Sequence, residues 1–286
     1  MSPTVPQTVK QVMALSPLPL LETRMIMEHV LQVPRAWLFS HDTDALTQAQ
    51  VQAIEALYAR RAQGEPMAYL LGYREFMGLN FMVNPHVLIP RPDTETLVEQ
   101  ALQSIEQLQN SGQSLLVLDV GTGSGAIALA IKYYAPKTRV TALDISTVAL
   151  AVARANAKLL NLEVNFMQSD VLDALQCLED EHERAGFNLI VSNPPYIAAR
   201  DPHLQKGDLR FEPSLALTDQ ADGLEIIRKL VCQAKEHLAP QGQLWLEHGW
   251  DQAPAVRALL QAQGFVAVSS KKDLAGIERI SGGTRP

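Results

Sequence analysis

Four consecutive residues with unusual hydrogen-bonding capacity, Asn193, Pro194, Pro195 and Tyr196, follow the apolar run Phe187–Val191. The run predicts a buried strand, so the tetrapeptide lies at a strand's C-terminal end, where open α/β sheets bind ligands. Prolines carry no N–H group, and Asn193 adds an amide oxygen as an acceptor. A planar –NH2 group fits the Asn193 side-chain oxygen and the Pro194 carbonyl, and Tyr196 offers a flat face for packing. The alternative is a plain strand-ending turn.

A glycine-rich loop lies between a predicted strand, 114–120, and a predicted helix, 126–134. Glycines let the backbone turn sharply and approach a ligand closely, and the helix N-terminus behind them presents unpaired N–H groups. The pattern therefore indicates a nucleotide-binding loop. Its residues are Gly121, Thr122, Gly123, Ser124 and Gly125.

The next two predicted strands are followed by carboxylates. Asp144 ends the run 138–144, 23 residues beyond Gly121, where a carboxylate suits the two hydroxyls of a ribose. It could instead, or also, cap the helix that begins near Ser146. Asp170 follows the predicted strand 164–168 and either accepts from an adenine amino group or caps the next turn.

Two nucleotide cofactors fit this βαβ pattern. The loop matches a dinucleotide fingerprint with Ala126 in third place, so an NAD enzyme is one alternative. However, the tetrapeptide 193–196 supplies no hydride-transfer partner. S-adenosylmethionine, a methyl donor with an adenosine half, explains the loop, Asp144 and the amino-group site together.

These motifs resemble a known family. The segments 119–125 and 193–196, with Asp144, are similar to class I S-adenosylmethionine methyltransferases that act on planar nitrogens. Upstream, GYREF at 72–76 and IPRPDTE at 89–95 resemble one branch, the bacterial peptide chain release factor glutamine methyltransferases of the HemK/PrmC family. The resemblance runs from roughly residue 20 to the C-terminus, and the IPRPDTE segment is what narrows the substrate.

The resemblance implies methyl transfer from S-adenosyl-L-methionine, with S-adenosyl-L-homocysteine as product, to N5 of the glutamine in the GGQ motif of release factors. It implies that Asn193, Pro194 and Tyr196 are catalytic and that Pro195 joins them in binding substrate. The implied cofactor contacts are Gly121, Thr122, Gly123, Ser124, Gly125, Asp144, Asp170, Val171 and Asn193. An aromatic residue often stands in the family where this chain has Val171.

Other functions remain open from the residues. The tetrapeptide is shared with adenine-N6 nucleic-acid methyltransferases and with ribosomal-protein glutamine methyltransferases. A third alternative is an interaction module that binds S-adenosylmethionine or a nucleotide without catalysis. The net charge of −7 weighs against nucleic acid as the substrate, because nucleic-acid binders usually show a basic surface.

Composition favours a soluble intracellular enzyme. With 286 residues and 47% hydrophobic content the chain can bury a large core, and we expect it to divide into two domains. Two distant cysteines indicate no disulfide framework, and the seven histidines show no metal-ligand spacing. No signal peptide or membrane-spanning segment is visible. We expect a cytoplasmic monomer without a metal that acts on release factors.

The pattern predicts three parts. Residues 1–75 read as short helices, at 20–31, 34–39 and 47–62, and form a substrate-docking domain or a stabilising appendage. Residues 76–90 suggest a β-hairpin linker. Residues 91–286 alternate strands and helices, which predicts an α/β fold with a doubly wound, mostly parallel, Rossmann-like sheet.

Several further elements are expected in the last part. We expect helices at 146–160, 222–239 and 252–263, strands at 242–248 and 265–270, and an antiparallel last strand at 277–281, which the resemblance implies. The segment 197–222 shows little periodicity. Because long loops inside compact domains are usually functional, it is interpreted as a substrate-binding lid.

Overall fold

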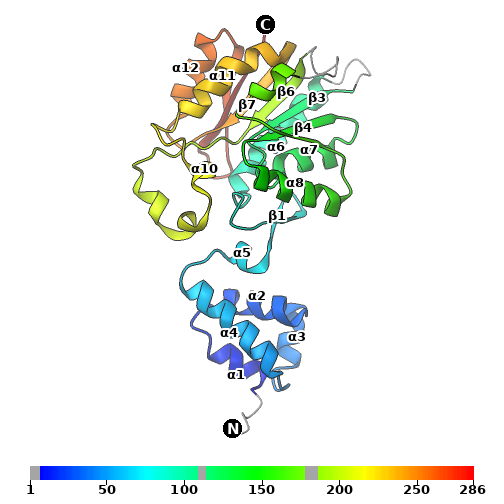
Figure 1. Cartoon of the computed structure of the whole chain (residues 1–286), viewed down its shortest axis with the longest axis vertical. Coiled ribbons are helices and arrows are strands. Elements are labelled where there is room, and N and C mark those ends of the chain that lie inside the picture. Colours follow the sequence, from blue (N-terminus) through cyan, green and yellow to red (C-terminus); the bar gives the residue numbers. More distant parts are fainter. Residues whose placement is uncertain (1–6, 109–113, 178–185) are drawn as a thin grey trace. The chain divides into compact units, whose positions relative to one another are not determined.

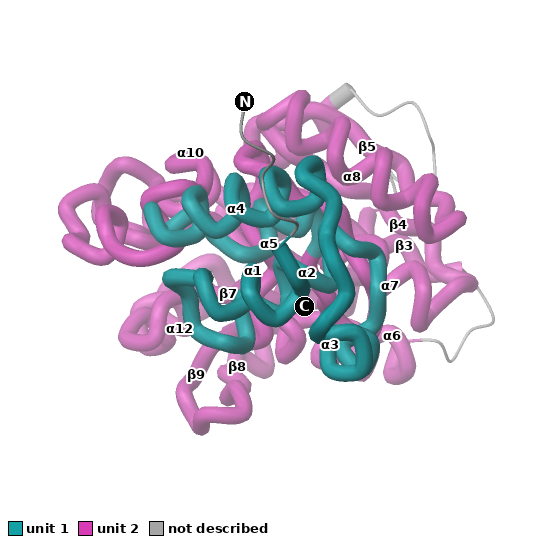
Figure 2. The backbone as a smooth tube through the Cα atoms, turned by 90° about the horizontal axis from the view of Figure 1, so that it is seen from below, with its two compact units in different colours: residues 1–73 teal, residues 74–286 magenta. Residues whose placement is uncertain are grey.

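The computed structural model describes residues 7–108, 114–177 and 186–286. The chain divides into two compact units, residues 1–73 and 74–286, which Figure 2 colours separately. Each unit has a hydrophobic core of its own.

Five helices make up the described part of unit 1: α1 (Val9–Ala14), α2 (Leu20–Leu31), α3 (Arg35–Ser40), α4 (Gln48–Ala62) and α5 (Met67–Leu71). The sequence pattern predicted α2, α3 and α4. It missed α1 and α5, which have six and five residues and are too short to display a helical period. Thr47 caps α4 in a capping box with Gln50, which explains why this helix begins where it does.

Apolar side chains from all of these helices meet in one cluster, in which Ile26, Met27 and Ile54 are fully buried. Arg61 of α4 also donates two hydrogen bonds to Glu22 of α2, at 2.9 and 2.7 Å. A two-bond arginine–carboxylate pair adds geometric specificity to the helix packing. The described helices of unit 1 are thus held in one arrangement by their shared core and by this ion pair.

A β-hairpin consists of β1 (Tyr73–Phe76) and β2 (Leu79–Met82). It begins at Tyr73 rather than at residue 76 as predicted, and residues 83–90 form no strand. Met77 and Gly78 both have positive φ, 52° and 74°, as a tight two-residue hairpin turn requires. Within unit 2, the amide of Asn156 binds the backbone of Met82 in both directions, at 2.7 and 3.0 Å.

A seven-stranded sheet forms the centre of unit 2, with the order β5-β4-β3-β6-β7-β9-β8. The first five of these pair in parallel, and β9 is antiparallel to both of its neighbours. The predicted α/β fold with a mostly parallel sheet and an antiparallel last strand is therefore confirmed. The strands are β3 (Leu116–Val120), β4 (Arg139–Asp144), β5 (Asn165–Gln168), β6 (Phe187–Ser192), β7 (Leu238–Glu247), β8 (Val266–Lys272) and β9 (Glu278–Thr284).

Helices cover both faces of this sheet (Figure 1). One face carries α6 (Glu95–Leu108), α7 (Ala126–Tyr134) and α8 (Thr147–Leu160), and the other carries α11 (Glu225–His237) and α12 (Ala253–Ala262). Along β3, Val117 belongs to the first cluster and Leu118 to the second, since successive strand side chains point to opposite faces.

The largest boundary differences in the sheet and its covering helices lie around α11 and β7. The helix predicted at 222–239 is α11, which begins at Glu225 and ends at His237. The chain then turns directly into β7, which begins at Leu238 and not at 242, because Leu238 already pairs with Phe187 of β6.

The segment 197–222, called the lid from here on, contains short helical turns rather than a plain loop. They are η4 (Pro202–Gln205), η5 (Gly207–Phe211) and α10 (Ser214–Leu217). The Ile197 N–H donates to the Leu217 carbonyl at 3.0 Å, so the two ends of the lid are paired at its base. Elsewhere, η1 (Pro92–Thr94) leads into α6, and η3 (Asp173–Cys177) follows β5.

Candidate active site

A cavity of about 430 Å³ opens at the carboxyl ends of the central parallel strands. This volume lies in the range of small-molecule sites, and the place is where open α/β sheets bind ligands. We call it the glycine-loop cavity. Its lining includes Val120, Gly121, Gly123, Asp144, Ile145, Asp170, Val171, Asn193, Pro194 and Pro195, together with lid residues Pro213, Leu215, Ala216, Thr218, Asp219 and Gln220.

The five loop residues have different positions. Gly121 and Gly123 line the cavity, whereas Thr122 and Ser124 are buried behind it. Gly125 packs against α8: a β-carbon there would lie 3.2 Å from the Ala153 β-carbon, and its φ is +83°. The structure thus brings two of the five predicted residues to the cavity, and the other three shape the loop.

Asp119 supports the loop from inside the sheet. Its Oδ2 accepts from the Thr122 hydroxyl at 2.6 Å and from the Ala128 N–H at 3.2 Å. Its Oδ1 is buried and has no hydrogen-bond partner among the described residues. Burial raises the pKa of Asp119 to about 7. The sequence analysis predicted no role for Asp119, although a single carboxylate in an otherwise apolar strand indicates a functional or structural role.

Asp144 lies at the end of β4 and lines the cavity as expected. Its Oδ2 accepts from the Gly123 N–H and its Oδ1 from the Ser146 N–H, both at 2.8 Å. The N-cap of α8 is Ser146, whose hydroxyl accepts from the Ala149 N–H at 3.2 Å. Asp144 therefore links the glycine loop to the start of α8. The residue that caps α8 is Ser146 and not Asp144. Burial raises the pKa of Asp144.

Asp170 and Val171 also line the cavity. Asp170 forms an ion pair with Lys229 of α11 at 2.9 Å, so its carboxylate is held from the side of the helix. Val171 is buried and has a φ of +50°, which is rare for a β-branched residue. The predicted adenine contact would thus meet one carboxylate and one apolar side chain.

The four residues of the tetrapeptide 193–196 also differ in position. Asn193, Pro194 and Pro195 line the cavity. Tyr196 is turned toward the protein instead: its hydroxyl donates to Glu247 Oε1 at 3.2 Å, and burial raises its pKa. The stacking face predicted for Tyr196 is not part of the cavity lining.

The side-chain amide of Asn193 has a defined orientation. Its Nδ2 donates to the Thr94 hydroxyl oxygen at 3.1 Å. Because the nitrogen is held in this way, the amide oxygen Oδ1 is the end of the side chain that can accept from a ligand. This is the orientation that the predicted –NH2 site requires.

The IPRPDTE segment, residues 89–95, connects the cavity to its surroundings. Glu212 in the lid accepts from the Ile89 N–H at 3.3 Å and forms an ion pair with Arg91, and its side chain is fully buried. Asp93 forms an ion pair with Arg279 of β9 at 3.2 Å. The segment therefore fastens the lid at one end and reaches the last strands of the sheet at the other.

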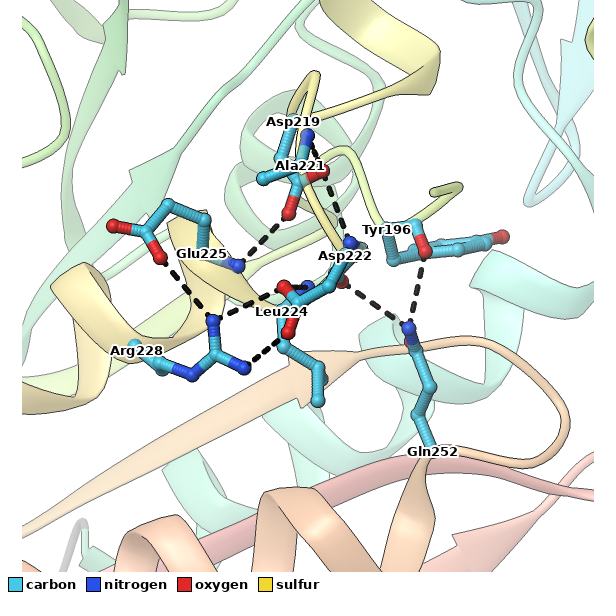
Figure 3. A network of polar contacts seen from close by, with 9 residues as sticks. Tyr196, Asp219, Ala221, Asp222, Leu224, Glu225, Arg228 and Gln252 are labelled. Atoms are coloured by element: carbon cyan, nitrogen blue, oxygen red, sulfur yellow. Dashed lines mark hydrogen bonds and ion pairs between the residues drawn. The ribbon is translucent and has the colours of Figure 1, made fainter. Parts of the chain in front are cut away.

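A second network holds the far end of the lid (Figure 3). Asp219 accepts from the N–H groups of Ala221, Gly223 and Glu225 at 2.8, 3.0 and 2.8 Å. Gln252 donates to the carbonyl oxygens of Tyr196 and Gly223 at 3.1 and 3.2 Å. The lid is thus bound to the tetrapeptide at the point where the chain enters α11.

Another cavity, of about 440 Å³, lies beside the end of α7 and is lined by residues such as Leu102, Tyr134 and Lys137. It contains none of the predicted site residues. The described residues include no group of three His, Cys, Asp or Glu side chains that could hold a metal ion. Those predicted residues that line a cavity therefore line the glycine-loop cavity and not this one.

Comparison with known proteins agrees with this geometry. The Methyltransferase small domain matches residues 98–207, and the PrmC N-terminal domain matches residues 7–72. The release factor glutamine methyltransferase of Bordetella pertussis is 52% identical over 275 residues, which are 96% of this chain and 98% of that protein. The release factor glutamine methyltransferase of Burkholderia pseudomallei is 50% identical and covers 98% of this chain and 97% of its own length.

This chain belongs to the release factor glutamine methyltransferase family. The resemblance expected from the motifs is confirmed. Two solved structures share the fold of this family member. A methyltransferase from Pyrococcus furiosus has 19% identity and a TM-score of 0.52 over 79% of this chain and 96% of its own. A Thermus thermophilus 16S rRNA N2 G1207 methyltransferase, in complex with AdoMet and guanosine, has 21% identity and a TM-score of 0.52 over 75% of this chain and 50% of its own.

Three residues at the site of this family member received no role from sequence reasoning: Asp119, Thr94 and Glu247. Thr94 was visible only as part of the IPRPDTE segment. Glu247 ends β7 and is buried, and burial raises its pKa to about 7. The contacts of Thr94 and Glu247 arise only when distant parts of the chain come together, whereas Asp119 contacts its own loop and the start of α7.

Proposed function

We propose that this chain transfers a methyl group from S-adenosylmethionine to the side-chain amide nitrogen of the glutamine in the GGQ motif of a peptide chain release factor. The observation that carries the proposal is the Asn193 amide, whose nitrogen is held by Thr94 and whose oxygen remains for a substrate N–H. The names of the relatives from Bordetella and Burkholderia support the same substrate.

The glycine-loop cavity fits the donor chemically. The lining combines Gly121 and Gly123, which permit close backbone approach, with the carboxylate of Asp144 for ribose hydroxyls. Asp170 and Val171 would hold the adenine. Asp119 supports the loop from behind the cavity, where its Oδ2 accepts from the Thr122 hydroxyl and the Ala128 N–H. When bound, S-adenosylmethionine supplies an electrophilic methyl group on a sulfonium.

The acceptor nitrogen needs help, because the lone pair of a carboxamide is delocalised into its carbonyl. Asn193 Oδ1 and the Pro194 carbonyl oxygen would accept the two N–H bonds and turn the lone pair toward the methyl group. Such orientation supplies up to roughly 7–11 kcal/mol in the best intramolecular cases. Since the nitrogen becomes positive in the transition state, both acceptors bind it more strongly there than in the ground state.

No dedicated base is required. The methylated nitrogen is a strong acid while it carries its extra proton, and it can release that proton to water. Tyr196 contributes from behind the site. Its hydroxyl donates to Glu247, and its carbonyl oxygen accepts from Gln252. Its role is thereby to hold Asn193, Pro194 and Pro195 in place.

The partner is a protein, and unit 1 offers a place for it. We infer that residues 1–75 dock the release factor, that residues 76–90 link the two parts and that residues 91–286 carry out methyl transfer. The match of the PrmC N-terminal domain to residues 7–72 supports a separate role for this part. Within the described residues, no helix is long and apolar enough to cross a membrane. We place the reaction in the cytoplasm, with a monomeric enzyme.

Mass spectrometry tests the proposal directly. Release factor incubated with this protein and S-adenosylmethionine should gain the mass of one methyl group on the glutamine of its GGQ motif. A release factor whose glutamine is replaced by alanine is the matched control and should gain none. Methylated adenine in a nucleic-acid substrate, with no change in the release factor, would overturn the proposal.

A further inference from the structure

The turn that follows β5, residues 170–173, forms part of the wall of the glycine-loop cavity. Asp170 and Val171 line the cavity, and the Asp173 N–H closes the turn by donating to the Asp170 carbonyl oxygen at 3.1 Å. Val171 is buried and has a φ of +50°, a conformation that turns normally give to glycine or asparagine. A β-branched residue keeps this conformation only where its surroundings hold it.

Helix α11 supplies the groups that hold this turn. Ile226, Lys229 and Gln233 are spaced three and four residues apart, which places them on one face of the helix. Ile226 lines the cavity itself. One helical turn further on, Lys229 Nζ lies 2.9 Å from Asp170 Oδ2 and 3.2 Å from Asp173 Oδ2. A single cation therefore bridges the two ends of the turn.

Gln233 completes the attachment of the turn to the helix. Its Nε2 donates to Asp173 Oδ1 at 2.7 Å, and its Oε1 accepts from the Leu172 N–H at 3.3 Å. Both oxygens of Asp173 are thus bound, and so is the backbone that follows Val171. Together with the two ion pairs, these bonds fix the turn on both sides of its unfavourable residue.

We propose that Lys229 is a positioning residue that makes this site selective for a nucleoside whose base carries an amino group. The lysine binds Oδ2 of Asp170, which leaves Oδ1 to accept from a ligand N–H. Lys229 is outside the described cavity lining, so it acts through Asp170. The inference rests on the proposed S-adenosylmethionine site and deepens it, because adenine carries such an amino group.

The exposure of these groups decides what kind of effect the lysine has. The side chain of Asp170 is 53% exposed and that of Lys229 is 33% exposed. Surface ion pairs contribute little to stability, because water and salt compete with them. Orientation is a different matter: without the cation, the exposed carboxylate can turn away from the cavity into water. Loss of Lys229 should therefore change the choice of ligand and leave the fold stable.

Calorimetry with two ligands tests this role in the full-length protein. The first ligand is S-adenosylhomocysteine, and the second is the same molecule with hydrogen in place of the 6-amino group. Wild type should bind the first about 10-fold more tightly, the lower end of the range for a hydrogen bond to a charged group. Lys229→Met removes the charge and should reduce this preference to less than about 3-fold. Lys229→Arg keeps the charge and should restore most of it.

Lys235→Met is the matched control. Lys235 belongs to the same helix, but its Nζ donates to the Gln263 carbonyl oxygen at the end of α12, at 2.9 Å. Its removal should leave the preference as in wild type. A merely structural role of Lys229 would weaken both ligands equally and leave their ratio unchanged.

A double variant shows whether the lysine acts through the carboxylate. Asp170→Asn keeps only an uncharged, weaker acceptor and should reduce the preference about as much as Lys229→Met. The variant with both changes should lose no more preference than either single variant. Additive losses in the double variant would contradict an action of Lys229 through Asp170.

The two proposals fail differently. A preference in Lys229→Met equal to that in Lys235→Met overturns the positioning role, and so does a wild type that binds both ligands equally well. A wild type that shows the preference but leaves the release factor unmethylated contradicts the proposed methyl transfer and not the role of Lys229. A wild type that binds neither ligand contradicts both.

Discussion

Gly223 lies directly against the carbonyl oxygen of Tyr196: a β-carbon added at Gly223 would come 2.5 Å from this oxygen. The φ of Gly223 is +85°, and Gln252 donates to the carbonyl oxygens of both residues. The residue that directly follows the lid therefore makes a close backbone contact with the tetrapeptide. Only glycine fits there.

This contact predicts that Gly223→Ala lowers both stability and turnover. Gly207→Ala is the matched control, since Gly207 lies in the lid and also has a positive φ, +56°, but has open space around its α-carbon. The control should lose about 1–2 kcal/mol from backbone strain alone. Gly223→Ala should lose more in urea unfolding, and its kcat should fall while Gly207→Ala keeps most of its activity. Equal losses in the two variants would contradict the close contact.

Asn193→Ala tests the acceptor site. Removal of one acceptor that strengthens in the transition state should lower kcat by ~10²–10³-fold. The affinity for S-adenosylmethionine, measured by calorimetry, should change much less. Turnover at the wild-type rate would refute the proposed role of the amide oxygen.

Asp144→Ala tests the ribose contact. Donor binding should weaken by roughly 1.5–3 kcal/mol, the range for hydrogen bonds to a charged group. Some of this loss reflects the loop, because Asp144 also accepts from the Gly123 and Ser146 N–H groups. Calorimetry measures the affinity for S-adenosylmethionine, and Glu163→Ala, at an exposed residue, is the control. NADH should not bind wild type, and tight NADH binding would revive the dehydrogenase alternative.

Asp119→Asn tests the buried carboxylate behind the loop. Burial raises the pKa of Asp119 from 3.8 to about 7 in the folded chain, so the folded state binds more protons than the unfolded state between these values. Its contribution to stability is therefore present at low pH and is lost as the pH rises toward 7, by up to about 1.4 kcal/mol for each pKa unit.

Asp119→Asn lacks this titration. Relative to wild type, its free energy of unfolding should improve as the pH rises from about 4 to about 7 in urea melts. Exposed Glu163→Gln should give a constant difference from wild type over the same range. A constant difference for Asp119→Asn as well would show that Asp119 ionises normally in the fold.

Removal of residues 1–72 tests docking. This cut keeps the whole hairpin, because β1 begins at Tyr73. Binding of S-adenosylmethionine to the remaining chain should persist, whereas KM for intact release factor should rise, since remote contacts position the reacting group. Circular dichroism must first show that the truncated chain is folded. Equal activity of both forms on intact release factor would make unit 1 a stabilising appendage.

Much of the structure of unit 2 can be predicted from local sequence. Each strand and helix displays its own hydrophobic period, and a chemical motif sits at the turn that follows a strand, so Gly121, Asp144 and Asn193 could be located from neighbouring residues alone. Parallel strands then bring these turns to one edge of the sheet, because their carboxyl ends coincide. This explains why the sequence determined the fold class and the motif residues that line the cavity.

Only the tertiary structure decided how the motifs are held. Thr94 binds Asn193 across 99 positions, Tyr196 binds Glu247 across 51, and Arg91 binds Glu212 across 121. A hydrogen bond between such distant residues leaves no period in the sequence, because its geometry depends on where the sheet places both partners. For the same reason the sequence predicted that the Tyr196 ring would offer a packing face at the site, whereas in the structure the Tyr196 hydroxyl points inward and donates to Glu247 at the end of β7.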